Sequence, residues 1–257
     1  SLLLSAPRGS PPPPRLLVVT YDSQVPCPRL APCSGTLARL EGSAVWGLGR
    51  VAAIEGPALG VTLVDVSPSD SGSHVCRALA HADATTSHLA CRDGRIYVPR
   101  LRAAAALDAK IESGGTYVVT GGLGGLGMRT ADLLLTRGRA ASLLLSSRSG
   151  RLPSAPTAPE SVLRAATTGR VLLSSCDVSV EGDVRALLRQ ATVTAARGGG
   201  PLRGLLHASG VLRNSLLRKA DSAGLDAVLA PKAAGAVLLH AAVATTPLSS
   251  LVLFSSV

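Results

Sequence analysis

The chain has 257 residues, 46% of them hydrophobic, so it is long and apolar enough for one large or two modest domains with buried cores. Only 2% of the residues are aromatic, which leaves Leu, Val and Ala to build those cores. The net charge of +10 fits an acidic partner or a phosphorylated cofactor, whereas scattered arginines and the scarcity of aromatic side chains that could stack on bases argue against nucleic-acid binding.

The first half of the chain alternates predicted strands and helices but has no phosphate-binding loop. Residues 1–14 are rich in proline and are expected to form a linker. We predict strands, helices and a closing hairpin in the order Arg15–Thr20 (strand), Ser43–Glu55 (helix), Val61–Val66 (strand), Ser71–Ala80 (helix), and His88–Cys91 with Arg95–Arg100 (hairpin). Gly47-Leu48-Gly49 lacks a third glycine and lies within a predicted helix, so packing explains it best, and Trp46 is expected in the core. Residues 15–110 are therefore predicted to be a structural α/β unit.

The second half, residues 111–257, shows a clearer alternation. Predicted strands lie at 116–120, Leu143–Ser146, Arg170–Leu173, Leu202–His207 and Ser249–Ser255. Between them we predict a helix that ends near Arg137, a short helix at Glu160–Thr167, a helix with Ser179 as its N-cap, and two helical segments from Asp221 to His240 that break at Pro231. Repeated βα units of this length indicate a Rossmann-like, doubly wound parallel sheet with helices on both faces.

A glycine-rich loop follows the first strand of this second half. Gly122, Gly124 and Gly127 fill the pattern Gly-x-Gly-x-x-Gly between a strand and a helix, which is the context that predicts dinucleotide binding. Small residues here allow a tight turn, close approach of the backbone to a pyrophosphate, and close packing of the helix on the strand. The predicted loop comprises Thr120, Gly121, Gly122, Leu123, Gly124, Gly125, Leu126 and Gly127.

The end of the second strand predicts which cofactor binds. An acidic residue there would bind the ribose 2′-hydroxyl of NAD, but this chain has Ser147 and Arg148. A guanidinium suits a 2′-phosphate through bidentate, charge-assisted hydrogen bonds. We therefore predict NADPH, while a solvated surface arginine is the alternative interpretation of Arg148.

Two further strand ends carry candidate cofactor-binding residues. The third strand is followed by Cys176, Asp177 and Val178, and the fourth ends in His207, Ala208, Ser209 and Gly210. The Asp177 carboxylate can accept a hydrogen bond from an adenine amino group or can help to start the next helix, and the sequence leaves both open. His207 at such a place is more often structural than catalytic.

The five cysteines are odd in number and include no Cys-x-x-Cys pair, and no signal peptide precedes them. This pattern favours free thiols in a reducing, cytoplasmic setting, and Cys27 and Cys33 are interpreted as ordinary loop residues rather than a metal pair. No apolar run is expected to reach the length of a membrane span, so we expect no contact with a membrane. We also expect no metal site. The chain begins without methionine, which suggests a piece of a longer protein.

Together these motifs resemble the ketoreductase domain of modular type I polyketide synthases, a branch of the short-chain dehydrogenase/reductase superfamily. The resemblance is carried by Thr120–Gly127, Ser147-Arg148, Cys176-Asp177-Val178, His207–Leu212, Ala230-Pro231-Lys232 and Leu253–Val257 in the second half. In the first half, Val45–Arg50, Leu63-Val64-Asp65 and Tyr97–Leu101 resemble the smaller, degenerate Rossmann-like structural subdomain of that family.

The resemblance implies that NADPH reduces a β-ketoacyl thioester, carried on the phosphopantetheine arm of an acyl carrier protein, to a β-hydroxyacyl thioester. Other domains of the same synthase are the remaining implied partners. Ser256 matches the family's serine, which binds the substrate carbonyl, and Lys232 matches its lysine, which supports the proton relay. Such groups stabilise the oxyanion that develops on a ketone as it accepts hydride.

Two positions depart from the family pattern. The resemblance implies a tyrosine acid about a dozen residues beyond Ser256, yet Tyr21, Tyr97 and Tyr117 all lie upstream. We therefore expect the polypeptide 1–257 to be incomplete at its C-terminus and inactive as it stands. Where many relatives have Leu-Asp-Asp, this chain has Leu212-Arg213-Asn214, which leaves the configuration of the alcohol open. The alternatives are a degenerate scaffold domain and a free-standing short-chain ketone reductase.

Overall fold

The computed structural model describes residues 16–24, 40–82, 87–101, 113–152 and 158–255. These residues form two compact units. The first holds the described residues up to 101 together with Leu216–Lys219, and the second holds the other described residues from 113 onward. The expected linker at 1–14, the loop with Cys27 and Cys33, the link at 103–110, and Ser256 lie outside the described residues.

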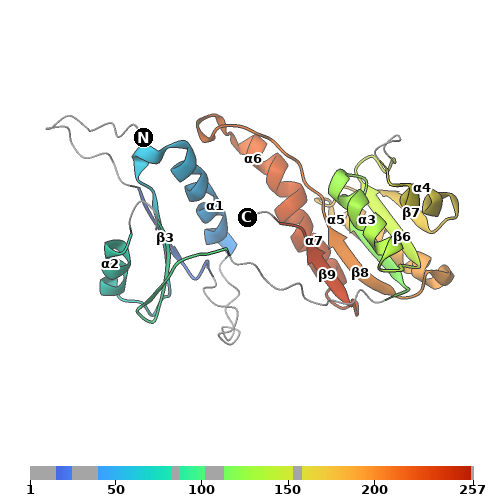
Figure 1. Cartoon of the computed structure of the whole chain (residues 1–257), viewed down its shortest axis with the longest axis horizontal. Helices are drawn as coiled ribbons and strands as arrows, with labels where there is room; N and C mark the ends of the chain where they lie inside the picture. The colour runs from blue at the N-terminus through green and yellow to red at the C-terminus, as the bar shows by residue number, and fades with distance from the viewer. Residues whose placement is uncertain (1–15, 25–39, 83–86, 102–112, 153–157, 256–257) are drawn as a thin grey trace. The chain divides into compact units, whose positions relative to one another are not determined.

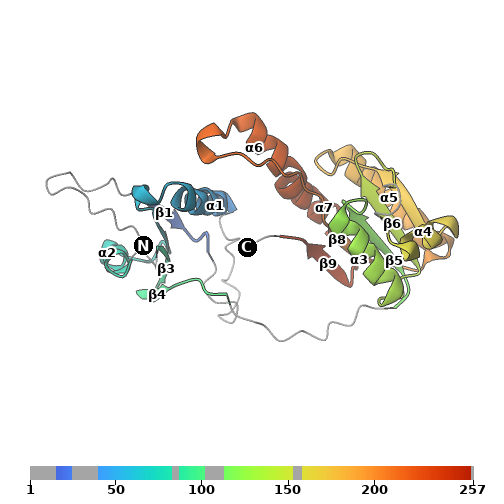
Figure 2. The same cartoon turned by 45° about the horizontal axis from the view of Figure 1, so that its top comes forward.

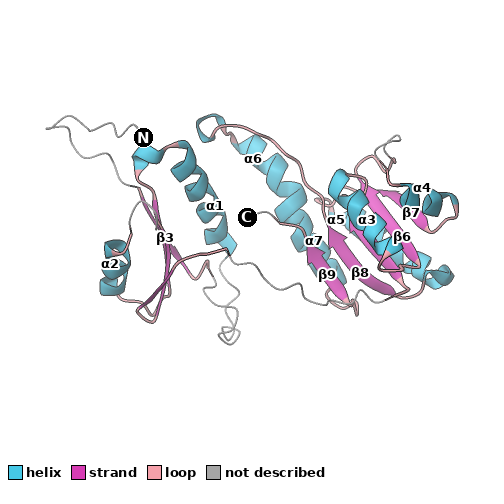
Figure 3. Cartoon of the chain, viewed as in Figure 1, coloured by secondary structure: helices cyan, strands magenta, loops and turns pink. Residues whose placement is uncertain are grey.

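The first unit is built on a four-stranded sheet of order β1-β2-β3-β4 (Figures 1 and 3). Its strands are β1 (Leu17–Tyr21), β2 (Thr62–Val66), β3 (His88–Arg92) and β4 (Arg95–Tyr97), of which the first three run parallel and β4 returns antiparallel to β3. The connections contain α1 (Leu40–Glu55), the 3₁₀ turn η1 (Pro57–Leu59) and α2 (Gly72–Ala80). The strands, helices and closing hairpin predicted for this half are confirmed, with small shifts at their ends.

Trp46 and Gly49 fix α1 on the sheet. The Trp46 side chain is buried, as expected, and its Nε1–H donates to Oγ1 of Thr20 at 2.7 Å. A Cβ atom at Gly49 would collide with Cδ2 of the buried Leu63, so a larger residue there would force that side chain to move. The Gly47-Leu48-Gly49 segment therefore belongs to a helix and its second glycine serves packing, as the sequence indicated.

Asp70 joins the start of α2 to the turn between β3 and β4. Its carboxylate accepts hydrogen bonds from the N–H groups of Ser67 (2.9 Å) and Gly94 (3.1 Å), and it lies 3.1 Å from Nδ1 of His74. The buried Cys91 thiol donates to the same carboxylate at 3.6 Å. In the described part of the chain, this is the one His/Cys/Asp group whose ligand atoms lie within 4.8 Å of one another. Since its members already bond one another, a structural role accounts for them.

The second unit is a five-stranded, all-parallel sheet of order β7-β6-β5-β8-β9 (Figure 1). Its strands are β5 (Thr116–Thr120), β6 (Ser142–Ser147), β7 (Val171–Ser175), β8 (Leu202–His207) and β9 (Ser250–Leu253). Its helices are α3 (Gly125–Thr136), α4 (Glu160–Thr167), α5 (Glu181–Thr194), α6 (Ser222–Leu229) and α7 (Gly235–Val243), with a π turn η2 (Ala195–Gly199) after α5. All five predicted strands are confirmed.

Alternate strand residues feed two cores, one on each face of the second sheet. One core packs α3 and α4 against Tyr117, Val119 and Leu145. The other packs α5 and α7 against residues that include Val118 and Leu144. Figure 2 shows the helices on the two sides of the sheet. The Rossmann-like, doubly wound architecture expected for this half is therefore confirmed, and a smaller α/β unit precedes it.

The predicted N-cap at Ser179 is wrong. Helix α5 begins at Glu181, with Val180 at the N-cap position and no side-chain cap. The Ser179 hydroxyl instead donates to Oδ1 of Asp177 at 2.6 Å, and its N–H donates to the same oxygen at 3.0 Å. A serine hydroxyl can serve either a helix end or a local turn, and here the preceding carboxylate captures it.

The predicted break at Pro231 is also wrong, because α6 and α7 are joined by a π turn, η4 (Ala230–Ala234). Proline cannot donate the next helical hydrogen bond. The helix continues because the N–H of Gly235 reaches back five residues to the carbonyl of Ala230. The wider turn therefore absorbs the proline without ending the helix.

The continuous helix Ser222–Val243 corrects the expectation that no apolar segment reaches the length of a membrane span. It has 22 residues and a mean hydropathy of 1.3 in its most apolar window, so by length and composition it is the one helix in the described residues that could span a membrane. Leu239 and Val243 pack into the core against the sheet. Most of the helix is nonetheless exposed, since only 17% of that window is buried.

Candidate functional site

The direction in which the chain adds strands to the second sheet reverses between β5 and β8. From β5 the chain proceeds to β6 and β7 on one side and then crosses to β8 and β9 on the other. In open parallel sheets, ligands bind outside the carboxyl ends of the strands at such a switch point. A pocket of about 520 Å³ lies there, lined by the segments that follow β5, β6, β7 and β8.

The glycine-rich loop forms one wall of this pocket. Gly121 has φ +67°, and a Cβ atom there would lie 2.6 Å from the backbone of Ala208, so the turn requires glycine at this position. A Cβ atom at Gly127 would collide with the carbonyl oxygen of Gly121, so α3 can start this close to β5 only without a side chain. Gly124 is the N-cap of α3 and lines the pocket. The positive end of the α3 dipole therefore faces the pocket.

A tight turn after β6 supplies two arginines to the opposite wall. The turn is closed by hydrogen bonds from the N–H of Gly150 to the carbonyl and the hydroxyl of Ser147. The Ser175 hydroxyl holds the carbonyl of Arg148 at 2.7 Å from the end of β7. Arg148 and Arg151 both line the pocket and are exposed, so two guanidinium groups are available to an anion.

Asp177 lies beside the arginines at the end of β7. Hydrogen bonds from the side chain and backbone of Ser179 lower the pKa of this carboxyl, and the nearby charge of Arg148 adds to that effect. One oxygen of Asp177 is thus used by the turn before α5, while the residue still lines the pocket. The carboxylate thus orders the turn before α5 without capping the helix itself, and a bond to an adenine amino group stays a prediction.

Lys232 lies at the rim of the pocket. It is exposed on the π turn between α6 and α7, and the preceding Pro231 lines the pocket. A Cβ atom on Gly210, which also lines the pocket, would lie 3.1 Å from Cε of Lys232. The lysine side chain therefore reaches the end of the pocket formed by the segment after β8.

The structure gathers most of the predicted residues but not all. Those that line the pocket are Gly121, Leu123, Gly124, Ser147, Arg148, Cys176, Asp177, Val178, Ala208, Ser209 and Gly210. Thr120, Gly122, Gly127 and His207 are buried and do not line it, while Gly125 and Leu126 are exposed outside it. Ser149, Arg151, Val211 and Pro231 line the pocket and were missed. The Ser-Arg-Ser-Gly-Arg spacing could have indicated Arg151, because a tight turn brings both arginines to one side.

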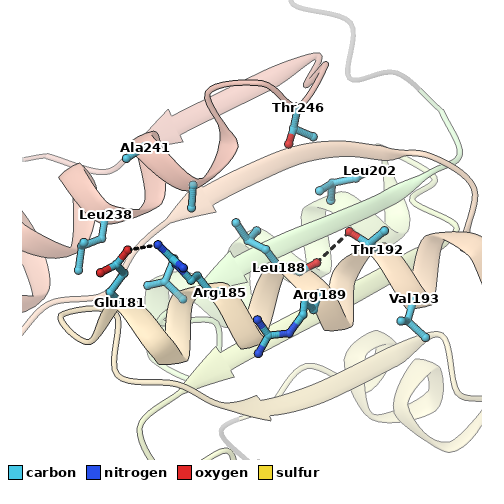
Figure 4. A pocket seen from close by; sticks show the side chains of 12 residues that line it. Glu181, Arg185, Leu188, Arg189, Thr192, Val193, Leu202, Leu238, Ala241 and Thr246 are labelled. Atoms are coloured by element: carbon cyan, nitrogen blue, oxygen red, sulfur yellow. Dashed lines mark hydrogen bonds and ion pairs between the residues drawn. The ribbon is translucent and has the colours of Figure 1, made fainter.

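A larger groove, about 670 Å³, lies along α5 and α7 (Figure 4). Among its lining residues, Glu181 and Arg185 form an exposed ion pair at 2.5 Å, and the Thr192 hydroxyl bonds the Leu188 carbonyl at 3.0 Å. These polar groups bond within their own helix instead of converging on the groove. We therefore place the functional site in the smaller pocket, where the loop, the arginines and Lys232 meet.

Cys176 should resist alkylation. Burial, followed by the carboxylates of Asp183 and Asp177, raises the pKa of this thiol to about 11. Only about one thiol in a thousand is then ionised at pH 8, and the thiolate is the reactive form. With iodoacetamide at pH 8, mass spectrometry should show rapid labelling of the exposed Cys76 and little of Cys176. Comparable labelling rates at the two cysteines would contradict the described burial.

Comparisons with known proteins show which families the two halves of the chain match. Residues 115–257 match the family described as "KR domain", and residues 8–101 match the Rossmann fold domain of the polyketide synthase extender module SpnB. The first match covers more than half of the chain.

Three similar proteins illustrate the relationship. A phenolphthiocerol/phthiocerol polyketide synthase protein of Mycobacterium tuberculosis is 36% identical over 220 residues, which are 82% of this chain and 12% of that protein. Polyketide synthase GfsA of Streptomyces halstedii is 37% identical over 84% of this chain and 3% of its own length. The solved ketoreductase from the first module of phoslactomycin biosynthesis in Streptomyces sp. HK803 is 31% identical, with a TM-score of 0.70 over 95% of this chain and 55% of that one. The chain thus spans a small part of these curated relatives.

Proposed function

We propose that this chain, which belongs to the KR (ketoreductase) domain family of polyketide synthases, uses NADPH to reduce a β-ketoacyl thioester to a β-hydroxyacyl thioester. The observation that carries the proposal is the convergence of the glycine loop, two arginines and Lys232 on one pocket at the switch point of the sheet. Residues 15–110 would be the structural subdomain and residues 111–257 the cofactor-binding and catalytic one.

The pocket fits NADPH in its shape and its donors. Because Gly121 has no side chain, the loop can turn against the backbone of Ala208 and presents its own backbone to the pocket. The start of α3 would hold the pyrophosphate, and Arg148 with Arg151 would hold the 2′-phosphate. Asp177 keeps its charge well below neutral pH because its pKa is lowered, so it can accept a hydrogen bond from the adenine.

NADPH, when bound, supplies the hydride. The chain's own residues would stabilise the negative charge that develops on the substrate oxygen. Lys232, at the rim of the pocket beside Gly210, would supply a cation, and the Ser256 hydroxyl, which follows β9, would donate a hydrogen bond. The substrate would be the acyl chain on the phosphopantetheine of an acyl carrier protein, within a multidomain synthase in the cytoplasm.

The polypeptide 1–257 should bind NADPH without turning over. Tyr117 is buried within β5 and so cannot act as the proton donor in this pocket, and neither Tyr21 nor Tyr97 matches the tyrosine that the resemblance implies about a dozen residues beyond Ser256. With a β-ketoacyl thioester of N-acetylcysteamine, absorbance at 340 nm should not fall steadily. A longer polypeptide of the same reading frame with a tyrosine about a dozen residues past Ser256 should turn over. A steady rate from 1–257 would contradict this account of the proton donor, and absence of NADPH binding would favour a scaffold domain.

A further inference from the structure

His207 occupies the centre of the second unit, beneath the pocket. It ends β8, between β5 and β9, and only 4% of the residue is exposed. It therefore cannot contact a ligand in the pocket with its side chain. Its neighbours in the chain, Ala208 and Ser209, do line the pocket.

One side of His207 is bonded to the loop that begins the cofactor site. Its Nδ1 lies 2.7 Å from Oγ1 of Thr120, the last residue of β5 before the glycines. The two residues face each other in register, and the N–H of Ala208 donates to the carbonyl of Thr120 at 2.9 Å. On the other edge of β8, the carbonyl of His207 accepts from the N–H of Phe254 at 3.0 Å, two residues before Ser256.

The other side of the ring faces the π turn that carries Lys232. Nε2 is buried and makes no hydrogen bond of full geometry with the described residues. Burial lowers the pKa of His207, while the nearby backbone of Lys232 and Pro231 opposes that shift. The ring carbon Cε1 lies 3.5 Å from where a Cβ atom of Gly235 would be. The free nitrogen is therefore directed toward the backbone of the turn between α6 and α7.

The groups around His207 favour one tautomer of its imidazole ring. Backbone carbonyls accept hydrogen bonds and never donate them, so they favour a proton on Nε2. Nδ1 is then the acceptor, and the Thr120 hydroxyl must donate to it. A neutral ring with the proton on Nε2 accepts from Thr120 at Nδ1 and directs its N–H toward the backbone of the turn, and burial favours the neutral ring.

We propose that His207 is a positioning residue that supports the glycine loop through one ring nitrogen, by way of Thr120, and the π turn that carries Lys232 through the other. The contact of His207 with the turn would fix the position of the Lys232 amine at the rim of the pocket, where Cε of Lys232 lies close to Gly210. The catalytic meaning of this contact rests on the proposed function, whereas the contact itself is independent of it.

Two conservative variants separate the two sides of the ring. Asparagine places a polar atom near the position of Nδ1, so His207→Asn can keep the bond to Thr120 and loses the contact with the turn. Glutamine places one near Nε2, so His207→Gln keeps the contact with the turn and loses the bond to Thr120. A merely structural histidine would show no such separation.

The lysine content of the chain supplies a direct readout. Lys110, Lys219 and Lys232 are its only lysines, so reductive methylation with ¹³C-formaldehyde gives three lysine NMR signals, and Lys232→Arg assigns the one of interest. His207→Asn should move the Lys232 signal while the NADPH dissociation constant, from fluorescence titration, stays within about twofold. His207→Gln should leave the Lys232 signal in place and weaken NADPH binding about fivefold, the loss of one neutral hydrogen bond. Lys219 is the internal control and should not move.

The outcomes separate the two proposals. Variants that alter both readouts together, or neither, would overturn the separate positioning of the two sides by His207. If His207→Gln does not fold, Thr120→Val takes its place and should weaken NADPH binding with the Lys232 signal unmoved; movement of that signal would count against the proposal. Failure of the unaltered protein to bind NADPH would refute the proposed function, while the Lys232 signal in His207→Asn would still test the contact.

Discussion

Replacing Arg148 with aspartate should weaken NADPH binding by about 2–3 kcal/mol, roughly 30- to 150-fold, and leave NADH binding nearly unchanged. The arginine lines the pocket, and the Ser175 hydroxyl bonds its carbonyl. This bond holds in place the backbone from which the guanidinium extends. NADH lacks the 2′-phosphate that this charge would bind, and an aspartate can accept a bond from its free 2′-hydroxyl. Dissociation constants from the fluorescence of each reduced cofactor measure the difference.

Arg189→Asp is the matched control for the change of charge. Arg189 is exposed on α5 in the same unit, lines the separate groove of Figure 4, and should leave both affinities unchanged. Arg151→Gln should weaken NADPH binding less than Arg148→Asp does, because it removes one charge without adding the opposite one. Equal losses for NADPH and NADH in Arg148→Asp would refute the assignment of the 2′-phosphate to this turn.

Gly121→Ala should destabilise the second unit by about 3 kcal/mol, a fall of about 10 °C in its unfolding temperature. The alanine would have to adopt φ +67°, and its Cβ would lie 2.6 Å from backbone atoms of Ala208 and Ser209. The backbone of Ala208, whose N–H is bonded to the carbonyl of Thr120, cannot move aside as a flexible side chain can. Differential scanning calorimetry measures the change.

Gly125→Ala is a control within the same loop. Gly125 is the first residue of α3, and no atom lies within 4 Å of where its Cβ would be. Alanine is the better helix former, so this variant should be as stable as the original protein or slightly more stable. Equal destabilisation by the two substitutions would show that the loop does not have the described conformation.

The second sheet was predictable because its signals are local. Each strand is a short apolar run, and the glycine loop stands between the apolar run at Tyr117–Val119 and a helical pattern. The residues that follow β5, β6, β7 and β8 could be assigned to one edge because parallel strands align their carboxyl ends. That reasoning gathered eleven of the predicted residues around one pocket.

The errors concern choices that depend on tertiary contacts. Ser179 could cap a helix or bond Asp177, and the sequence does not rank these two partners. Pro231 favours a helix break, but packing of Leu239 and Val243 on the sheet holds the helix together through a π turn. His207 was assigned to the cofactor site from its place at a strand end; its side chain is bonded to Thr120 and does not line the pocket, a contact that depends on the register of β5 and β8.

The central claim is that the pocket at the switch point is an NADPH site. The most direct test is a fluorescence titration of the unaltered protein with NADPH and with NADH, followed by displacement with 2′,5′-ADP, which carries the 2′-phosphate and the 5′-phosphate of the adenosine half of NADPH but no nicotinamide. The account predicts saturable NADPH binding at one site, at least tenfold tighter than NADH binding, and full displacement by 2′,5′-ADP. Equal affinity for the two cofactors, or NADPH that 2′,5′-ADP cannot displace, would contradict it.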